Sequence, residues 1–542
     1  MKQWIFIFVL LTAPLLHATN AVYISDAGAG TQDGSSCANA KPHSYFNTAG
    51  NWSATPTGIQ IGPDTTVHTC GTFTGALNAT ELQFQGSGTS GHPVILFMET
   101  GTDFTSPAWN NSGGTIDCNG QSFWTIDGGT NGTIENTDNG DWLDNQNATE
   151  AISSSTGVFC NNATVKDLII KNIYIKVQGI NDNANSCGPS HTALCPGDNT
   201  QFMNFLGHDV LVTRNTMSYA AEGVALPGQN GTANQEVSFN TITFCSRCVV
   251  LGTGPAQGST GISIHDNDFG GGAYLWDNTA NNYHHDVIQL VCESNTQPCM
   301  TNPQIYNNYV HGVWSTTGHT TSFFFGDDYT TSKITGLVQY NNVISSDSGD
   351  VGVASSYLSG ATGGTTVANN TILLNPTSGG NGCNGMQPSP SFIYNNILAK
   401  CGNALYAPNG TTGLTVDYNL YYSLAGSGWA NDTFAQWQSA GFDAHGQNGN
   451  NPNLNANFTL SAGSPAIGAG KNLTSSCSGS LAGLCTGAPQ TFGRTGACGT
   501  GCVPRAASGA WDQGAYPFSN APPVLPSPAF SMFSLLNPLE VP

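Results

Sequence analysis

The segment Tyr340-Asn341-Asn342-Val343-Ile344 decides the fold, because its pattern of short strand, asparagine and short strand returns along the chain. Further copies begin at Lys171, Arg214, Phe239, His265, Tyr306, Ala368, Tyr394 and Asp417. One asparagine of each copy falls at positions 172, 215, 240, 267, 308, 342, 370, 396 and 419. A period in the mid-twenties with occasional insertions predicts a solenoid, whose coils pair their strands with the coils above and below.

Asparagine suits the bend between two strands for two physical reasons. It tolerates the left-handed backbone conformation, and identical side chains one coil apart can form a ladder of hydrogen bonds. An asparagine-rich chain would also produce such pairs by chance. Each copy here is followed by apolar residues, which favours the solenoid.

The composition excludes several classes of protein. Charged residues make up 8% of the 542 residues, and the formal net charge is −21. A typical globular domain is about one quarter charged. This composition excludes coiled coils, charge-driven disorder and a basic nucleic-acid-binding surface. The chain also lacks a Gly-Lys-Ser/Thr loop after a strand, which argues against a nucleotide-dependent enzyme.

The first 21 residues are typical of a secretory signal. Lys2 precedes an apolar run from Trp4 to Leu16, with small residues at Ala18 and Ala21. No later stretch is apolar enough to span a membrane, so we expect a secreted or cell-surface protein. Sixteen cysteines in an exported chain predict disulfides within loops. The sequence-near couples are Cys187 with Cys195, Cys292 with Cys299, Cys383 with Cys401, Cys477 with Cys485, and Cys498 with Cys502. Cys245 and Cys248 could instead be half of a zinc site, although no second pair accompanies them.

The repeat resembles the right-handed parallel β-helix of the pectin-lyase-like superfamily, over roughly residues 22–425. The resemblance implies an all-β solenoid with caps at both ends. We therefore divide the chain into a signal peptide (1–21), an N-terminal cap with the first coils (22–160), the β-helix coils (161–425), a C-terminal capping segment (426–518) and a proline-rich tail (519–542).

The capping segment carries a second resemblance. Ser464-Pro465-Ala466-Ile467, Arg494 and the stretch 511–516 are similar to the closing segment of many exported bacterial β-helix proteins. That segment usually reads SPAIDAG, D-x-x-G-x-R and DIGAYE. Here Gly468 replaces its first acid, and no Asp stands at the expected place before Arg494. The resemblance implies a structural cap, in which Arg494 pairs with Asp512.

Ionisable residues concentrate between positions 265 and 328, beside two long insertions. This stretch holds five of the twelve histidines. When the coils are aligned on the strand that follows the bend, Glu222, Arg247, Asp286 and Asp350 precede equivalent strands. The alignment predicts a groove lined by acids, one arginine and imidazoles, although each residue could also be an ordinary turn residue.

Two reactions on a glycan fit these residues. Hydrolysis requires two carboxyl groups, for which Asp286 can pair with Asp327 or Asp328. Elimination from a uronate polymer requires a base and a cation, for which His285 and Arg247 are candidates. The side chains predicted to bind the sugar are Trp276, Tyr283, Trp314 and His319.

The sequence predicts no resident cofactor and no metal ligands. The negative net charge repels polyanions, so a uronate polymer would require bound Ca²⁺. We therefore predict a polysaccharide hydrolase or lyase whose partner is an extracellular glycan. The alternative is a surface-structural or adhesive solenoid that performs no catalysis, and the fold alone does not decide between the two.

Overall fold

The structure of the chain is a computed structural model, and it confirms the all-β, right-handed parallel β-helix. It describes residues 20–137, 154–161, 163–171, 173, 176–178, 194–196, 199–228, 231–253, 258–273, 285–292, 299–315, 321–328, 334–347, 353–358, 364–374, 383–386, 391–406, 410–424, 428–430, 432–489, 491–496 and 502–519.

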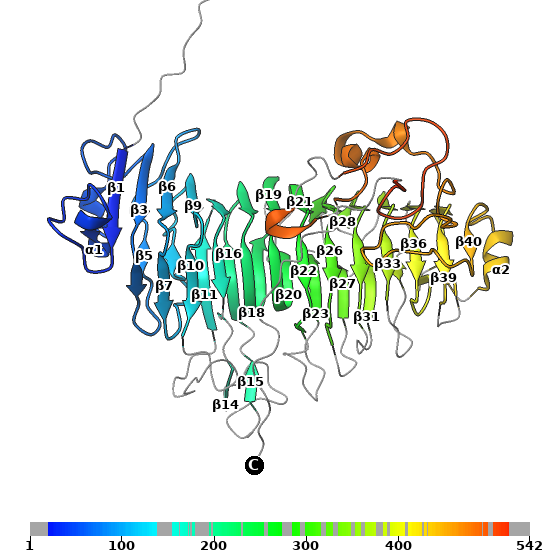
Figure 1. The fold of residues 1–542 in the computed structure, drawn as a ribbon, viewed down its shortest axis with the longest axis horizontal. Helices are drawn as coiled ribbons and strands as arrows, with labels where there is room; N and C mark the ends of the chain where they lie inside the picture. The colour runs from blue at the N-terminus through cyan, green and yellow to red at the C-terminus, as the bar shows by residue number, and fades with distance from the viewer. Residues whose placement is uncertain are drawn as a thin grey trace, which may run out of the picture.

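Three parallel sheets run the length of the solenoid (Figure 1). Sheet 1 consists of β2 (Lys41–Pro42), β1 (Asn20–Ser25), β3 (Thr65–Thr69), β6 (Val94–Met98), β9 (Trp124–Asp127), β12 (Ala163–Lys166), β17 (Val210–Thr213), β19 (Thr232–Ser238), β21 (Thr260–His265), β25 (Gln304–Tyr306), β29 (Val338–Tyr340), β32 (Thr365–Ala368), β35 (Ser391–Tyr394) and β38 (Leu414–Asp417).

Sheet 2 follows the bend of each coil. It consists of β4 (Thr72–Thr74), β7 (Asp103–Ser106), β10 (Thr133–Asn136), β13 (Ile169–Lys171), the first parts of β18 (Thr216–Pro227) and β20 (Thr241–Thr253), β22 (Asp268–Gly270), β26 (Tyr309–His311), β30 (Val343–Ser345), β33 (Thr371–Leu373), β36 (Ile397–Ala399), β39 (Leu420–Tyr422) and β40 (Gln447–Asn448).

Sheet 3 closes each coil. It consists of β11 (Ser154–Cys160), β16 (Asn199–Phe205), the second parts of β18 and β20, β23 (His285–Cys292), β27 (Thr321–Asp328), β31 (Val353–Leu358), β34 (Asn384–Met386) and β37 (Leu405–Tyr406). The remaining strand pairs are β5 (Leu82–Gln83) with β8 (Ile116–Asp117), β14 (Lys176–Gln178) with β15 (Leu194–Pro196), and β24 (Met300–Thr301) with β28 (Ile334–Thr335).

The strands β18 and β20 are long because each continues through a corner of the coil. Thr216 in β18 pairs with Ile169 of sheet 2, whereas Glu222 in the same strand pairs with Gln201 of sheet 3. The corner itself is a left-handed residue, Tyr219, with φ 67°. A single continuous strand thus supplies two faces of the solenoid.

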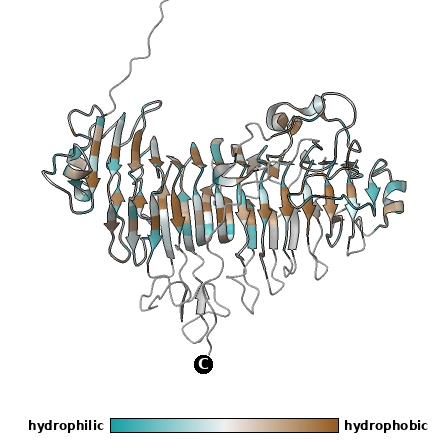
Figure 2. Ribbon diagram, viewed as in Figure 1, coloured by the Kyte–Doolittle hydropathy of each residue, from teal (hydrophilic) through white to brown (hydrophobic). Residues whose placement is uncertain are grey.

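One hydrophobic core extends through the coils. Its buried residues run from Val22 in the first coil to Trp437 beyond the last. Figure 2 shows hydrophobic residues in the strands from one end of the solenoid to the other. Because each sheet turns one face inward, the core is continuous although no single coil could bury it alone.

The predicted asparagine ladder is present at one corner. Each ladder amide donates from Nδ2 to Oδ1 of the next: Asn308, for example, donates to Asn342 at 3.1 Å and accepts from Asn267 at 3.0 Å. Asn308 also donates to the carbonyl of Ile264 at 3.0 Å. The buried ladder residues are Asn215, Asn240, Asn267, Asn308, Asn342, Asn370, Asn396 and Asn419. Position 172 lies outside the described residues.

The left-handed residue at this corner is not the ladder asparagine itself. It is the residue before it, for example Asn307, Asn341 and Asn395, with φ between 54° and 59°. The sequence predicted that one asparagine both adopts the left-handed conformation and forms the ladder, whereas two consecutive residues share these roles. The first turns the backbone, and the second makes the ladder.

The ladder ends at Asp443, which the sequence did not single out. Its carboxylate accepts from Asn419 Nδ2 at 3.0 Å, from Trp437 Nε1 at 3.1 Å and from the Tyr421 hydroxyl at 2.5 Å. Burial raises the pKa of Asp443 and also that of the Tyr421 hydroxyl. The short helix α2 (Phe434–Ser439) carries Trp437 and begins with a capping box, so residues 432–448 close the last coil.

The segment from residue 451 to 519 lies along one flank of the solenoid, drawn in orange and red in Figure 1. It bonds to the left-handed residues of three of the bends. The Asn395 amide donates to the carbonyl of residue 471, the Asn341 amide donates to that of residue 486, and the amide N–H of residue 493 donates to the Asp266 carbonyl. The ladder thus faces inward, and the preceding residues hold the C-terminal segment.

The expected pair of Arg494 and Asp512 is wrong. Arg494 donates to the carbonyls of Thr130 and Asp167, while the Asp512 carboxylate accepts from two backbone N–H groups. The buried arginine of this segment is Arg505, which donates to Asn341 Oδ1 and to three carbonyls. Burial lowers the pKa of Arg505 to about 9.

Two of the five disulfides predicted from the cysteine spacing are present, and they join Cys383 to Cys401 and Cys477 to Cys485. The couples Cys187 with Cys195, Cys292 with Cys299, and Cys498 with Cys502 stay predictions, because each falls at least in part outside the described residues or side chains. Bonds that the sequence did not predict join Cys37 to Cys70 and Cys118 to Cys160. Cys245 and Cys248 form a disulfide, so they are not half of a zinc site.

The two ends of the sequence lie outside the described residues. The predicted signal peptide is described only from Asn20, where β1 begins, and the predicted tail only at residue 519. Among the described residues, no helix is long and apolar enough to cross a membrane.

Candidate functional site

The structure aligns four polar residues in one row across sheet 3. Gln201 of β16 pairs with Glu222 of β18, Glu222 with Arg247 of β20, and Arg247 with Asp286 of β23. The predicted alignment is therefore confirmed for Glu222, Arg247 and Asp286, which are paired on neighbouring strands. We call Gln201, Glu222, Arg247 and Asp286 the polar row.

Beyond Asp286 the predicted register is wrong. Ser322 occupies the next position in the row and Ala354 the one after. Asp350, the expected acid, lies outside the described residues, and Ala354 stands at its place in the register. Insertions shift the strands by a few residues, which an alignment on one bend does not detect.

Contacts within the row join unlike groups. Arg247 Nη2 forms an ion pair with Glu222 Oε1, and Gln201 Nε2 donates to Glu222 Oε2 at 2.5 Å. The side chain of Glu222 is 12% exposed and that of Arg247 is 32% exposed, whereas Asp286 is completely buried. The row therefore presents its arginine and one carboxylate to solvent and keeps its second carboxylate inside.

His285 lies beside this row and is also buried. Its Nδ1 lies 3.0 Å from the hydroxyl oxygen of Ser246, the residue before Arg247. The disulfide between Cys245 and Cys248 encloses both Ser246 and Arg247 in a loop of two intervening residues. This crosslink restricts the backbone that carries the arginine of the row.

The predicted carboxylate pair of Asp286 with Asp327 or Asp328 is wrong on distance. Asp286 pairs with Ser322, so Asp327 follows five residues further along β27. At about 3.3 Å per residue, the two backbones are about 17 Å apart. Paired-carboxylate mechanisms require a separation of about 5–9.5 Å between the carboxyl groups. Glu222 is the better partner, since two strand spacings place it about 10 Å from Asp286.

The predicted sugar-binding residues receive little support. Trp276, Tyr283 and His319 lie outside the described residues. Trp314 is completely buried, its ring packs edge-on against Phe323, and its indole N–H donates to the carbonyl of His311 at 3.0 Å. Trp314 therefore contributes to the core and presents no ring face to a ligand.

The ionisable residues that are dense in the sequence between 265 and 328 separate onto three sheets. His265 lies on sheet 1, His311 lies on sheet 2 with Nε2 2.7 Å from Asp268 Oδ1, and His285 lies on sheet 3. The prediction of one joint cluster is wrong, because consecutive strands of a coil face different directions.

His265 forms its own buried contact. Its Nδ1 lies 2.7 Å from Asp266 Oδ2 and its Nε2 lies 3.3 Å from Glu236 Oε1. Burial alone would lower the pKa of His265, but the hydrogen bonds to Asp266 and Glu236 outweigh it and raise the pKa to about 9. The ring also stacks on Tyr306, at 4.6 Å between centroids.

Sequence reasoning missed two members of the site. Gln201 and Ser246 are uncharged and carry no motif, so only the register reveals them. Aligning one coil further toward the N-terminus would have found Gln201, because it is opposite Glu222.

The described fold and the polar row define the chain as a right-handed parallel β-helix protein with a polar site on sheet 3. No family model matches the chain, and no curated protein matches it. Two solved structures are similar to it. Pectate lyase Pel9A matches at 14% identity with a TM-score of 0.38, covering 88% of this chain and 96% of its own. A polygalacturonate lyase fused with a self-assembling amphipathic peptide matches at 10% identity with a TM-score of 0.22, covering 79% and 85%.

Proposed function

We propose that the chain acts outside the cell on a neutral polysaccharide and hydrolyses it at the polar row. The observation that carries the proposal is the register of Glu222, Arg247 and Asp286, which sets two carboxylates on either side of one arginine. Their backbones are about 10 Å apart, just beyond the separation of about 6.5–9.5 Å between the two carboxyl groups of an inverting hydrolase.

The reaction requires one carboxyl group to protonate the leaving oxygen and the other to activate water. Glu222 and Asp286 are the candidates for these two roles. Arg247 would hold a hydroxyl or ring oxygen of the sugar between them. The Ser246 hydroxyl orients the His285 ring behind the row, at 3.0 Å from its Nδ1.

Hydrolysis is favoured over elimination by the charges around the arginine. Elimination needs a cation that is available to neutralise the carboxylate of a uronate. The Arg247 guanidinium is already paired with Glu222. In addition, a net charge of −21 repels a polyanionic substrate. A neutral glycan meets neither obstacle.

The test is a screen of neutral and uronate polysaccharides, with and without Ca²⁺, that measures reducing ends and the ultraviolet absorbance of unsaturated products. We expect reducing ends from a neutral polymer without unsaturated products. The variants Glu222→Gln and Asp286→Asn should each lower kcat by about 100-fold or more. Arg214→Gln, which alters an arginine–carboxylate pair away from sheet 3, should not change it.

Unsaturated products from a uronate polymer would contradict hydrolysis. Full activity of Asp286→Asn would contradict the assignment of the residues. Circular dichroism of each variant controls for loss of the fold.

Glycan binding without cleavage is the second candidate, and the complete burial of Asp286 favours it. In that case Arg247 and Glu222, the partly exposed members of the row, bind the sugar alone. Affinity electrophoresis in gels that contain the polysaccharide would then show retardation, reduced in Arg247→Gln, while no product forms.

A further inference from the structure

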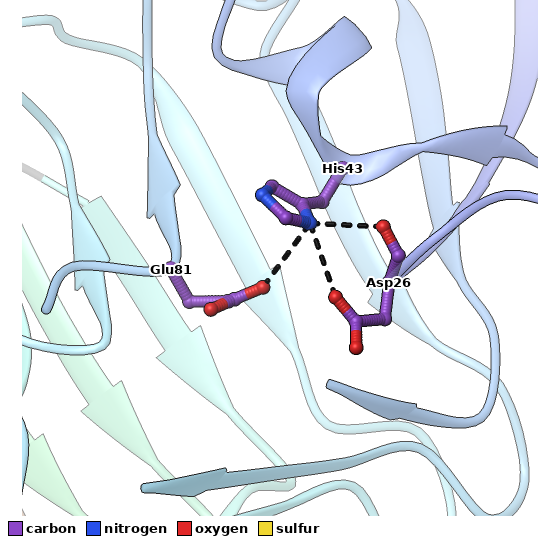
Figure 3. Close-up of side chains that lie close together, drawn as sticks. All are labelled: Asp26, His43 and Glu81. Atoms are coloured by element: carbon purple, nitrogen blue, oxygen red, sulfur yellow. Dashed lines mark hydrogen bonds and ion pairs between the residues drawn. The ribbon is translucent and has the colours of Figure 1, made fainter. Parts of the chain in front are cut away.

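Three side chains at the N-terminal end of the solenoid converge on one point (Figure 3). His43 Nδ1 lies 3.2 Å from Asp26 Oδ1 and 3.4 Å from Glu81 Oε1. The backbone carbonyl oxygen of Asp26 lies 2.9 Å from the same nitrogen. Three oxygens thus surround one imidazole nitrogen.

Secondary structure brings the three residues together. Asp26 directly follows β1 and His43 directly follows β2, and the last residues of these strands, Ser25 and Pro42, are paired in parallel. The His43 N–H also donates to the Asp26 carbonyl at 3.1 Å. Glu81 immediately precedes β5 on a later coil.

Glu81 is fixed from both sides. The Asn47 amide, at the end of α1 (His43–Phe46), donates to the Glu81 carbonyl at 2.9 Å and accepts from the N–H of Gln83 at 2.8 Å. The Glu81 N–H donates to the carbonyl of Thr115 at 3.0 Å. These bonds fix the backbone of Glu81, from which the carboxylate extends toward His43.

The Glu81 carboxylate has an incomplete set of partners. The residue is 6% exposed, and its Oε1, which points at His43, accepts no hydrogen bond in the described part of the chain. A neutral imidazole has one N–H, and Nδ1 can donate to only one of the three oxygens around it. A buried carboxylate oxygen without a hydrogen bond requires a positive charge close by, such as a bound cation.

We propose that Asp26, His43 and Glu81 bind a divalent metal ion of the zinc class. The separations of 3.2 and 3.4 Å match the roughly 3.0–3.4 Å between neighbouring ligand atoms that bonds of about 2.1 Å produce. An imidazole ligand favours zinc-class ions over Ca²⁺ and Mg²⁺, which prefer oxygen alone. His43 and Asp26 are about one-third exposed, so the ion and a coordinating water can enter from that side.

The expected effect of the metal is structural. It joins β1 and β2, the edge of sheet 1, to the start of β5. The end of a solenoid has unpaired backbone groups and needs a stabilised terminal coil. The sequence predicted no metal ligands, because 17 and 38 positions separate these three residues and no motif connects them.

Isothermal titration of the metal-free chain with Zn²⁺ tests the proposal. We expect one saturable site and a rise in the midpoint of thermal unfolding on Zn²⁺ addition that EDTA reverses. Glu81→Gln and His43→Gln should each weaken binding at least about tenfold and abolish the thermal shift. Co²⁺ in place of Zn²⁺ should give visible absorption bands that these variants lack.

His68→Gln is the matched control. His68, on the neighbouring strand β3, also lies close to a carboxylate, with Nδ1 2.6 Å from Glu99 Oε1. Among the residues that the structure describes, no second carboxylate joins that pair. This variant should keep the site and the thermal shift. Absence of a saturable Zn²⁺ site, retention of the shift in Glu81→Gln, or tighter binding of Ca²⁺ than of Zn²⁺ would overturn the proposal. If Glu81→Gln fails to fold, the half-buried His43 still permits the test with His43→Gln.

Discussion

The solenoid contains two columns of polar side chains that differ in kind. In the asparagine ladder, one residue type repeats from Asn215 to Asn419, and each amide supplies the acceptor for the amide before it. In the polar row, four neighbouring positions hold Gln201, Glu222, Arg247 and Asp286.

The difference shows which column serves the fold. A structural column is expected to repeat one residue type, because every coil must form the same hydrogen bonds with the next coil. A column of unlike, ionisable residues cannot form the same hydrogen bonds on every coil. The next residues in the register, Ser322 and Ala354, do not continue it. We therefore expect the ladder to determine stability and the polar row to determine function.

The largest expected effect is that of Asn308→Ala in the middle of the ladder. It removes the acceptor of the buried Asn267 amide and of the Asn267 N–H, and it removes the donor to the Ile264 carbonyl. Each buried polar group left without a partner costs about 1–3 kcal/mol. We expect a loss of about 3–4 kcal/mol in the free energy of unfolding, measured by urea denaturation followed by circular dichroism.

Asn307→Ala, one residue away, is the control. Asn307 makes one 3.3 Å hydrogen bond to Asp266 and adopts φ 54°. Its replacement should cost about 1 kcal/mol, the difference between asparagine and alanine in a left-handed conformation. Equal losses for the two variants would contradict the division of the bend into a turning residue and a ladder residue.

The second prediction concerns the dependence of stability on pH, which the amides of the ladder do not affect but the buried His265 does. The folded pKa of His265 is about 9 and its unfolded value is 6.5, so the protonated imidazole stabilises the fold fully below pH 6.5. This stability is lost as the pH rises from 6.5 through about 9. We expect a decrease of up to about 3 kcal/mol over that window, since one pKa unit corresponds to about 1.4 kcal/mol.

Thermal unfolding of His265→Gln should show a much flatter profile between pH 6.5 and 9. The variant His311→Gln, which alters a histidine with a single carboxylate partner, should keep the slope of the unsubstituted chain. A slope unaffected by His265→Gln would show that Asp266 and Glu236 do not hold the proton.

The same contrast explains what the sequence could predict. The ladder repeats in sequence, so its residues, the strand order and the coil length follow from the positions of asparagine alone. The register of Glu222 with Arg247 also followed, because each lies seven residues after its ladder asparagine, Asn215 or Asn240. Asp286 lies 19 residues after Asn267, beyond an insertion, and its strand was matched by its apolar residues.

The site beyond this row could not be predicted, for a geometric reason. Residues close in sequence, such as His265 and His285, lie on different sheets, whereas residues on one sheet are a whole coil apart. Density of charge along the sequence is therefore a poor guide in a solenoid. Asp26, His43 and Glu81 converge because β1 and β2 end, and β5 begins, at neighbouring positions. These positions follow no sequence repeat, so the repeat does not predict the convergence.

The third prediction concerns the stability of the polar row. Glu222→Gln removes the ion pair with Arg247 but retains an oxygen that can accept from Gln201. Arg247 is one-third exposed and can recover hydration, so we expect a loss of only about 1 kcal/mol in urea denaturation. A loss as large as that of Asn308→Ala would mean that the row, like the ladder, serves the fold.

The smallest expected effect is that of Arg214→Gln. Arg214 donates from Nε and Nη2 to the Asp167 carboxylate at 3.0 and 2.9 Å, but its side chain is 45% exposed. Exposed pairs of this kind contribute about 0.2–1 kcal/mol, and salt weakens them. A double-mutant cycle with Asp167→Asn should give a coupling near 0.5 kcal/mol that falls as NaCl is raised.

The corresponding cycle of Arg247→Gln with Glu222→Gln should give a larger coupling with a weaker dependence on salt, because Glu222 is more deeply buried than Asp167. Identical couplings and salt dependences would show that burial of the row has no electrostatic consequence, and the distinction between a functional column and an ordinary surface pair would then fail.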